Sequence, residues 1–373
     1  MNSPLTIVMP LKGRPLFTLR FLWHANKARL PYSFIIADGE VHPELAALIE
    51  NSAETFPNLD IDYHRYPDDH NFLQYYAKMA DVMQRVRTPY VKIADNDDLL
   101  APVGLAHCVD FLDACPDYVC CSGGISGFSV HPQPCDSFGM VVGPLNKLTD
   151  CHAPRDRALD LKSPSTTERL LAGLRNTWSF YAVFRAPALA QMWQEVQEIA
   201  PTNFALKERF LAMRALTMGK AQSQGGIVTY WRQYWTSLQL HWTSSDSAVR
   251  RDFIYYLLRS RFTDDFANIL NRISQLAADN DCGDAAEIAE RLRGPLGEWV
   301  RDVIGLDFGP YAALRRHLRT YAPRIVRWLK TRRRLSVVLE RRHILQKLTA
   351  HGATPEYLAK FKSELAQIED VLT

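Results

Sequence analysis

The fold is decided by the stretch at residues 90–100, which reads YVKIADNDDLL. Its first half has the aromatic and β-branched residues of a buried strand, and its second half places Asp95, Asp97 and Asp98 within four residues. Open α/β sheets bind ligands at the carboxyl ends of their strands. In an extended chain Asp95 and Asp97 point to the same side, and two such oxygen ligands suit Mg²⁺ or Mn²⁺ carrying a diphosphate. The alternative is that an aspartate caps the helix that follows.

Strands and helices alternate on the amino-terminal side of this stretch. Buried strands are predicted at residues 5–9, 33–37 and 61–66, and helices at residues 17–28, 43–52 and 71–86. The first strand is expected to end at Pro10, and the second ends in the turn pair Asp38-Gly39. This alternation predicts a βαβ series with a mainly parallel sheet, in which Asp38 and Asp95 share one crevice.

Length and composition exclude several classes of protein. The 373 residues, with 47% hydrophobic and 23% charged residues, are typical of a globular protein with two domains. We find neither a signal peptide nor an apolar run of the roughly 18 residues needed to cross a membrane. Seven cysteines without CxxC spacing predict a reduced, cytoplasmic compartment, and favour buried thiols over a metal site at Cys135, Cys151 and His152.

The chain after this stretch is less regular. Residues 120–165 are rich in Gly, Ser and Pro and predict an irregular insertion, either a lid or a surface loop. Ser165 to Glu168 fits a capping box that opens a helix, and residues 178–184 predict a strand. A helix at residues 207–218 ends at Gly219, and an aromatic strand at residues 227–235 closes the first domain.

Four of these elements resemble the nucleotide-binding half of inverting family 2 glycosyltransferases, which have the GT-A fold. The first strand ends in Pro10 and a loop with Lys12 and Arg14, and the second ends in Asp38. A helix that follows Asn71 carries Ala77-Lys78, and the fourth strand ends in Ala94 to Asp98, similar to a DxD motif. The resemblance implies that the nucleotide-sugar is bound by Pro10, Lys12, Arg14, Asp38, Lys78, Asp95 and Arg232. It also implies a divalent cation, Mn²⁺ or Mg²⁺, held by Asp97 with Asp95.

The helix at residues 207–218 resembles the one that carries the catalytic base in this family. Glu208, Arg214 and Gly219 reproduce the spacing of the family's Asp, Arg and Gly. Glu208 is therefore identified as the base by resemblance, although Lys207 replaces an acid and Glu replaces Asp. The alternative is an acid in the first helical turn favoured by the helix dipole. Trp178 and Tyr181 are candidates for stacking on an acceptor sugar, and an aromatic core is the alternative.

Residues 246–373 are predicted to form a separate helical domain after a catalytic domain at residues 1–245. Residues 314–347 hold twelve basic residues against one acid, Glu340, although the net charge of the chain is only +3. Cations interleaved with apolar residues predict contact with an anionic membrane surface; packing on the first domain is the alternative. Nucleic acid is the less favoured partner, because base-stacking aromatic residues are sparse there.

The sequence thus predicts an α/β glycosyltransferase of the GT-A type, in the cytoplasm or peripheral on the inner face of the membrane. It would move a sugar from a nucleotide-sugar to a hydroxyl of a glycan or lipid-linked acceptor, in the assembly of a bacterial-type surface polysaccharide or glycan. One alternative is a nucleotidyltransferase, which also uses paired aspartates with Mg²⁺. The other is a non-catalytic scaffold that binds nucleic acid or membranes through the basic segment.

Overall fold

The computed structural model describes residues 3–130, 145–149, 160–174, 181–233, 262–308, 336–350 and 352–372. Its strands are β1 Leu5–Leu11, β2 Ser33–Asp38, β3 Asp60–Arg65, β4 Tyr90–Ile93, β5 Leu99–Leu100, β6 Tyr118–Val130, β7 Leu145–Thr149, β8 Asp160–Leu161, β9 Val183–Arg185 and β10 Lys220–Gln233. Its helices are α1 Pro15–Lys27, α2 Pro43–Glu50, α3 Ser52–Thr55, α4 Phe72–Arg85, α5 Pro102–Ala114, α6 Thr166–Gly173, α7 Ala186–Ile199, α8 Phe204–Met218, α11 Phe262–Asp281, α12 Ala285–Phe308, α15 Ser336–Ala350 and α16 Pro355–Leu372.

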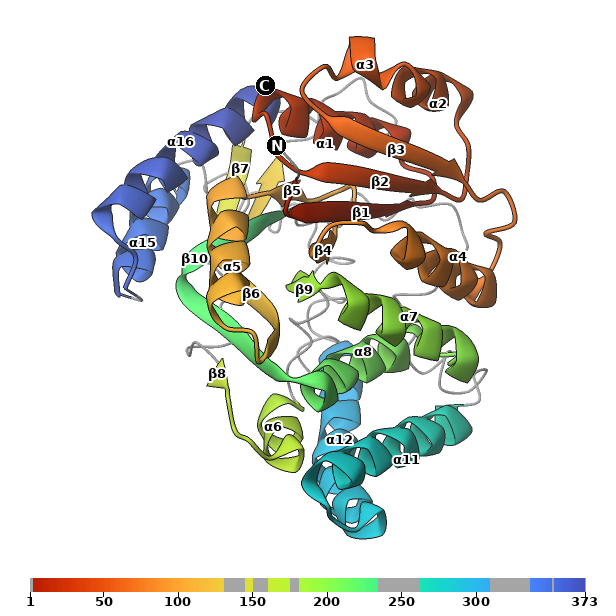
Figure 1. The fold of residues 1–373 in the computed structure, drawn as a ribbon. Coiled ribbons are helices and arrows are strands. Elements are labelled where there is room, and N and C mark those ends of the chain that lie inside the picture. Colours follow the sequence, from red (N-terminus) through yellow and green to blue (C-terminus); the bar gives the residue numbers. More distant parts are fainter. Residues whose placement is uncertain are drawn as a thin grey trace.

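One mixed sheet runs through the molecule in the order β3-β2-β1-β4-β9-β6-β10-β5, as Figure 1 shows. β1, β2, β3 and β4 pair in parallel, and so do β6 and β10, whereas the short strand β9 joins β4 to β6 in the antiparallel direction. The predicted α/β fold class with a largely parallel sheet followed by helices is therefore confirmed.

The first strand continues past the residue where the sequence predicted its end. Pro10 pairs in register with Ala37 of β2, and Leu11 pairs with Asp38, whereas pairing with β4 stops at Val8. Pro10 lacks an N–H group and lies beyond the end of the β4 ladder, where no donor toward β4 is needed. This extension brings the loop after β1 beside Asp38.

The prediction of irregular structure from residue 120 onward is wrong for the segment up to residue 130. Tyr118–Val130 forms the long strand β6, which lies between β9 and β10 in the sheet. The small residues that predicted a loop are needed for packing, because a Cβ atom added to Gly123 would lie 2.8 Å from the Ile227 carbonyl oxygen. Residues 131–144 and 150–159 lie outside the described residues.

Apolar helices cover both faces of the sheet. One core cluster joins alternate residues of β1, such as Ile7 and Met9, to α1, α2 and α5. The other joins Val8 and Ile93 to α4, α7 and α8. The alternation of the strand side chains between the two clusters is what a sheet covered on both faces requires.

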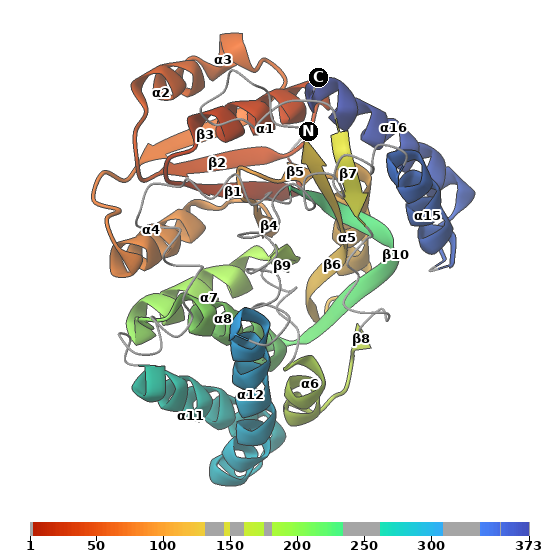
Figure 2. The ribbon, with the colours of Figure 1, turned by 180° about the vertical axis from the view of Figure 1, so that it is seen from behind.

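The helices of the predicted carboxyl-terminal domain pack in two pairs at different ends of the molecule (Figures 1 and 2). α11 and α12 pack with α6 and α8, and their core residues belong to the second cluster. α15 and α16 contribute to the first cluster beside α1, α5 and β10. Residues 309–335, which hold most of the basic segment, lie outside the described residues. Within the described part of the chain, every helix is too short or too polar to cross a membrane.

The shorter predictions have mixed outcomes. The helix cap at Ser165 is confirmed, because its hydroxyl accepts a hydrogen bond from the Glu168 N–H at 3.3 Å. Asp281 of α11 also accepts from the N–H groups of Thr166 and Thr167, so a distant helix completes this cap. The strand expected at residues 178–184 is met only at its end, because β9 is Val183–Arg185 and the described residues Tyr181 and Ala182 precede it. Trp178, Cys135, Cys151 and His152 lie outside the described residues.

Candidate active site

The carboxyl ends of β1, β2 and β4 meet at one edge of the sheet and bring two predicted carboxylates there. Asp38 ends β2, is only 2% exposed, and accepts hydrogen bonds from the Glu40 N–H at 3.0 Å and the Tyr63 hydroxyl at 2.8 Å. Asp95 follows β4, which pairs with β1 on the side opposite to β2. The two aspartates that were predicted to share a crevice therefore lie at the edge where open α/β sheets bind ligands.

A buried ion pair fixes the loop that follows β1. The Lys78 ammonium donates to the Asp69 carboxylate at 2.5 Å and to the Leu11 carbonyl at 3.1 Å. Lys12 donates to the Asp69 backbone carbonyl, also at 2.5 Å. A Cβ atom at Gly39 would lie 2.3 Å from an Asp69 carboxylate oxygen, so the close approach requires glycine. Lys78 thus holds the loop that carries Lys12, and Asp69 is a residue that the sequence analysis missed.

Two arginines contact the acidic stretch after β4. Arg14 has a positive φ of 58° directly before α1, and its guanidinium contacts the Asp97 carboxylate at 2.9 Å. Arg20, one and a half turns further along α1, donates to the Asp97 backbone carbonyl at 2.7 Å and to the Gln233 side chain. Burial lowers the pKa of Arg20 to about 10, against the opposing effect of Asp97 and Asp98, so it remains charged at neutral pH.

The third carboxylate of the stretch has a structural role. Asp98 is 6% exposed and accepts a hydrogen bond from the Gln233 N–H at 3.1 Å, which ties the stretch to β10. Burial raises the pKa of Asp98 well above its ordinary value, and the charges of Asp97 and Asp95 add to this effect. Of the three clustered aspartates, this leaves Asp95 and Asp97 as the candidates for ligand binding.

Tyr181 brings Asp95 and Arg232 to one place. Its hydroxyl donates to the Asp95 carboxylate at 2.6 Å, and the Arg232 guanidinium lies 5.7 Å from the centre of its ring. Burial raises the pKa of Tyr181 well above its ordinary value, and Asp95 adds to it, so the phenol keeps the proton that it donates. The predicted donor-binding residues Asp95 and Arg232 are thus neighbours, although they are far apart in the sequence.

The first turn of α8 approaches Asp95 from the other side of the sheet edge. Asn203 caps this turn by accepting from the Leu206 N–H at 3.2 Å. Lys207 is fully buried, with its ammonium 5.5 Å and 5.8 Å from the ring centres of Trp193 and Tyr75. Burial lowers the pKa of Lys207 to about 8, and the charges of Glu208 and Asp95 oppose this effect. Both carboxylates therefore lie within electrostatic reach of one ammonium group.

The remaining residues of the α8 pattern support the helix itself. Arg214 makes two hydrogen bonds to the buried Glu195 carboxylate, at 2.7 Å and 2.8 Å. At Gly219 an added Cβ atom would lie 3.1 Å from the Asp117 carbonyl, where the chain turns into β10. Glu208 is half-buried and directly follows Lys207 in the sequence. In this pattern Arg214 and Gly219 therefore support the helix, and Glu208 is its half-buried acid.

The carboxylates suit a divalent cation only in part. Asp95 and Asp97 supply the oxygen ligands that Mg²⁺ and Mn²⁺ prefer. In the described part of the chain, however, no three His, Cys, Asp or Glu side chains gather into a metal site. A cation held by these two aspartates would therefore complete its coordination with oxygen atoms of a bound diphosphate and water.

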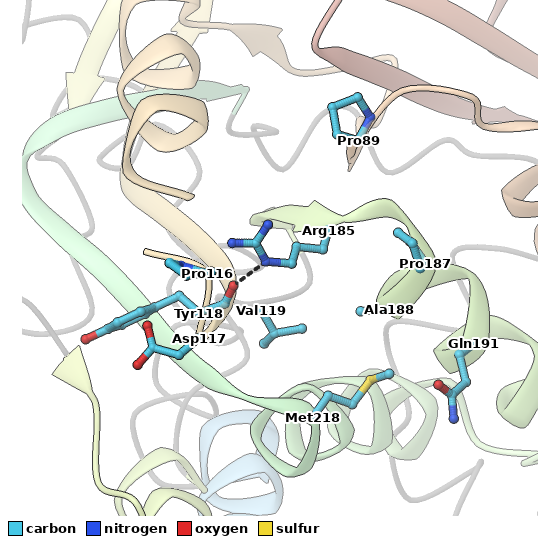
Figure 3. Close-up of a pocket in the computed structure, with 10 residues that line it drawn as sticks. All are labelled: Pro89, Pro116, Asp117, Tyr118, Val119, Arg185, Pro187, Ala188, Gln191 and Met218. Carbon is cyan, nitrogen blue, oxygen red and sulfur yellow. Dashed lines mark hydrogen bonds between the residues drawn. The ribbon is translucent and has the colours of Figure 1, made fainter. Parts of the chain in front are cut away.

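A cavity of about 550 Å³ lies at the opposite edge of the sheet (Figure 3). Its walls come from the amino ends of β4 and β6, the start of α7 and the end of α8, through Pro89, Tyr118, Pro187 and Met218. Arg185 in its wall donates to the carbonyls of Tyr118, Leu112 and Cys115, so this cation supports the carboxyl end of α5. We do not assign this cavity to the active site.

No family model and no curated protein matches the sequence. Among solved structures, S. aureus TarS 1-349 aligns with a TM-score of 0.50 at 10% identity, over 99% of this chain and 89% of that chain. TarS 1-349 in complex with UDP-GlcNAc aligns with a TM-score of 0.47 at 10% identity, over the same shares. The mannosyltransferase PcManGT from Pyrobaculum calidifontis, in complex with GDP-Man and Mn²⁺, aligns with a TM-score of 0.40 at 14% identity, over 86% of this chain and 85% of that chain. The likeness to TarS 1-349 shows that the chain shares the fold of that protein.

Proposed function

We propose that this protein is an inverting, metal-dependent glycosyltransferase that uses a nucleotide-sugar donor. The proposal is supported by contacts between segments far apart in the sequence: Tyr181 joins Asp95 to Arg232, Arg14 contacts Asp97, and the charges of both Asp95 and Glu208 reach Lys207. A nucleoside diphosphate has hydrogen-bond donors on its base and ribose and negative charge on its phosphates. The carboxylates of this site suit the first end, and its Lys and Arg side chains suit the second.

Each donor-binding residue has a role that follows from its place. Asp38 is held by Tyr63 and Glu40 at the end of β2, where its carboxylate accepts from the nucleotide base. Pro10 and Lys12 form the adjoining wall, supported by Lys78 through Asp69. Asp95 accepts from the ribose, and Arg232 binds the diphosphate with its planar guanidinium, which matches phosphate oxygens.

Asp97, with Asp95, would hold the divalent cation, which when bound would supply positive charge against the departing diphosphate. Arg14 contacts the Asp97 carboxylate at 2.9 Å, so its guanidinium supplies positive charge at the same place. These residues therefore supply the electrostatic stabilisation that a diphosphate leaving group requires.

Glu208 acts as the general base. It takes the proton from the acceptor hydroxyl while that oxygen attacks the anomeric carbon and the bond to the diphosphate breaks. A single displacement inverts the anomeric configuration. We propose a glycan or lipid-linked acceptor in surface polysaccharide assembly, reached by contact of the basic segment at residues 314–347 with an anionic membrane.

The proposal is tested by incubating the protein with UDP- and GDP-sugars, with and without Mn²⁺, and following release of the nucleoside diphosphate. We expect one donor to be consumed only with the cation, and proton NMR to show an inverted anomeric centre in the product. Retention of configuration would reject the role of Glu208 as a base in a single displacement. Release of a sugar 1-phosphate instead of a nucleoside diphosphate would identify a nucleotidyltransferase.

A further inference from the structure

Tyr181 contacts three charged residues of the candidate site. It precedes β9, and its three functional parts each have a different partner. Its backbone carbonyl accepts a hydrogen bond from Lys92, its hydroxyl donates to Asp95, and its ring faces Arg232. These partners come from β4, from the loop after β4, and from β10.

Lys92 fixes the backbone of this tyrosine. The lysine is 1% exposed in the middle of β4, and its ammonium lies 4.9 Å and 6.0 Å from the ring centres of Tyr230 and Tyr181. Burial lowers the pKa of Lys92 to about 8, while Asp98 and Asp95 are among the groups that oppose this effect. Because a buried ammonium requires hydrogen-bond acceptors, the contact with the Tyr181 carbonyl holds that segment against the sheet.

Arg232 has two acidic neighbours that would attract it. Burial disfavours its charged form, but Tyr181, Tyr230, Asp98 and Asp95 together raise its pKa above the ordinary value. Within the described residues its guanidinium faces the Tyr181 ring and makes no hydrogen bond or ion pair. An ion pair with Asp95 would consume the positive charge that a diphosphate needs and the carboxylate that a ribose or cation needs.

We propose that Tyr181 is a positioning residue that keeps the Arg232 guanidinium and the Asp95 carboxylate apart, so that both remain available to the donor. The ring provides a surface over which the guanidinium is held by its attraction to the aromatic face. The hydroxyl holds the carboxylate at the edge of the same ring. This inference rests on the proposed donor binding, and it replaces the acceptor contact expected for Tyr181 with a role on the donor side.

A double-mutant cycle on Tyr181 and Asp95 tests the inference. The probe is inorganic pyrophosphate without metal. Its affinity depends on cationic side chains such as Arg232, and it contains neither ribose nor base. Its affinity is measured by isothermal titration calorimetry for the wild type, Tyr181→Leu, Asp95→Asn and the double variant. Circular dichroism and thermal melts establish that each variant is folded.

We expect Tyr181→Leu to weaken pyrophosphate binding by roughly fivefold or more, because Arg232 then pairs with Asp95. Adding Asp95→Asn removes that competing carboxylate and restores binding. The gain from Asp95→Asn should therefore be several times larger in the leucine background than in the wild type. Equal gains in the two backgrounds, or no pyrophosphate binding by the wild type, would overturn the inference.

One further variant separates the role of the Tyr181 ring from that of its hydroxyl, and a second variant is a control. Tyr181→Phe keeps the ring that holds Arg232 but frees the Asp95 carboxylate, so we expect it to weaken pyrophosphate binding by less than Tyr181→Leu does. Tyr90→Phe is the matched control, because its hydroxyl donates to Asp113 at 2.5 Å at the other end of β4, away from the site. If the cycle behaves as expected but the wild type binds no nucleoside diphosphate, the proposed function fails while the positioning role stands.

Discussion

At the scale of single residues, the candidate site depends on how its charges are paired. Three carboxylates within four residues are balanced by Arg14, Arg20 and Arg232, which approach from α1 and β10. Burial raises the pKa of Asp98, and its carboxylate accepts a hydrogen bond from the Gln233 N–H, so its role is structural. The chemistry is therefore expected to reside in Asp95, Asp97 and Glu208.

The role of Glu208 is tested by its amide. Glu208→Gln keeps the shape of the side chain but cannot accept a proton, so we expect donor affinity to remain and kcat to fall by about 10²–10⁴-fold. Steady-state kinetics and calorimetry with the same donor measure the two effects separately. If the variant loses donor affinity but keeps its maximal rate, Glu208 is a binding residue.

The role of Asp97 is tested by removing its carboxylate. Asp97→Ala should abolish the response to Mn²⁺ and nearly all transfer, whereas the fold should survive because the hydrogen bond from Arg20 goes to the backbone carbonyl. Activity is measured with EDTA and with added Mn²⁺, and the fold by circular dichroism. Near-normal turnover of this variant would show that the metal assignment is wrong.

At the scale of elements, the helix α16 supports the strand that carries Arg232. The Tyr357 hydroxyl accepts from the Val228 N–H at 2.6 Å, and Phe361 stacks on Trp231 with ring centres 5.2 Å apart. Glu364 accepts from the Val103 N–H at 2.8 Å, at the start of α5. The last helix of the chain is thus part of the packing behind the candidate site.

The stability that the packing of α16 contributes should depend on pH through Glu364. Burial raises its pKa to about 7, against the opposing hydrogen bond from Val103, so the folded state prefers the protonated acid. Its contribution to stability is full below the unfolded pKa near 4.5 and is lost as the pH rises through 7. Relative to the wild type, Glu364→Gln should therefore gain up to about 3 kcal/mol between pH 5 and pH 8. Urea unfolding at both pH values measures this difference, and a difference that does not change with pH would contradict it.

The sequence predicted elements better than it predicted contacts. The alternation of strands and helices, and the aspartates at the ends of β2 and β4, follow from local patterns, and the structure has them. The sequence did not indicate roles for Arg20, Asp69 and Lys92, because the partners of buried polar residues are tertiary contacts that no local pattern shows. Gly123 of β6 favoured a loop in the sequence because the reason for it, the close approach of β10, is also a tertiary contact. Glu208 as the base, Asp97 as the metal ligand and the boundary at residue 245 stay predictions.

At the scale of the whole molecule, the helices after residue 262 pack as two pairs against different parts of the sheet domain. The basic segment at residues 314–347 lies between these pairs in the sequence. We expect the protein to bind anionic liposomes at low salt and to dissociate as salt is added, because each cation near the surface contributes about 1 kcal/mol. The change of Arg332, Arg333 and Arg334 together to Glu should weaken binding in a flotation assay and leave donor binding intact. An absence of binding at low salt would remove the membrane contact from the account.

Binding of a nucleoside diphosphate tests the central claim most directly. Thermal melts with UDP, GDP, ADP and CDP, each with and without Mn²⁺, should show one nucleotide that raises Tm more than the others, and more with the cation than without it. Asp38→Ala should abolish this preference, and Tyr90→Phe, at the opposite end of the sheet, should keep it. If none of the four nucleotides raises the Tm of the wild type under either condition, the crevice formed by Asp38, Asp95 and Arg232 is not a donor site.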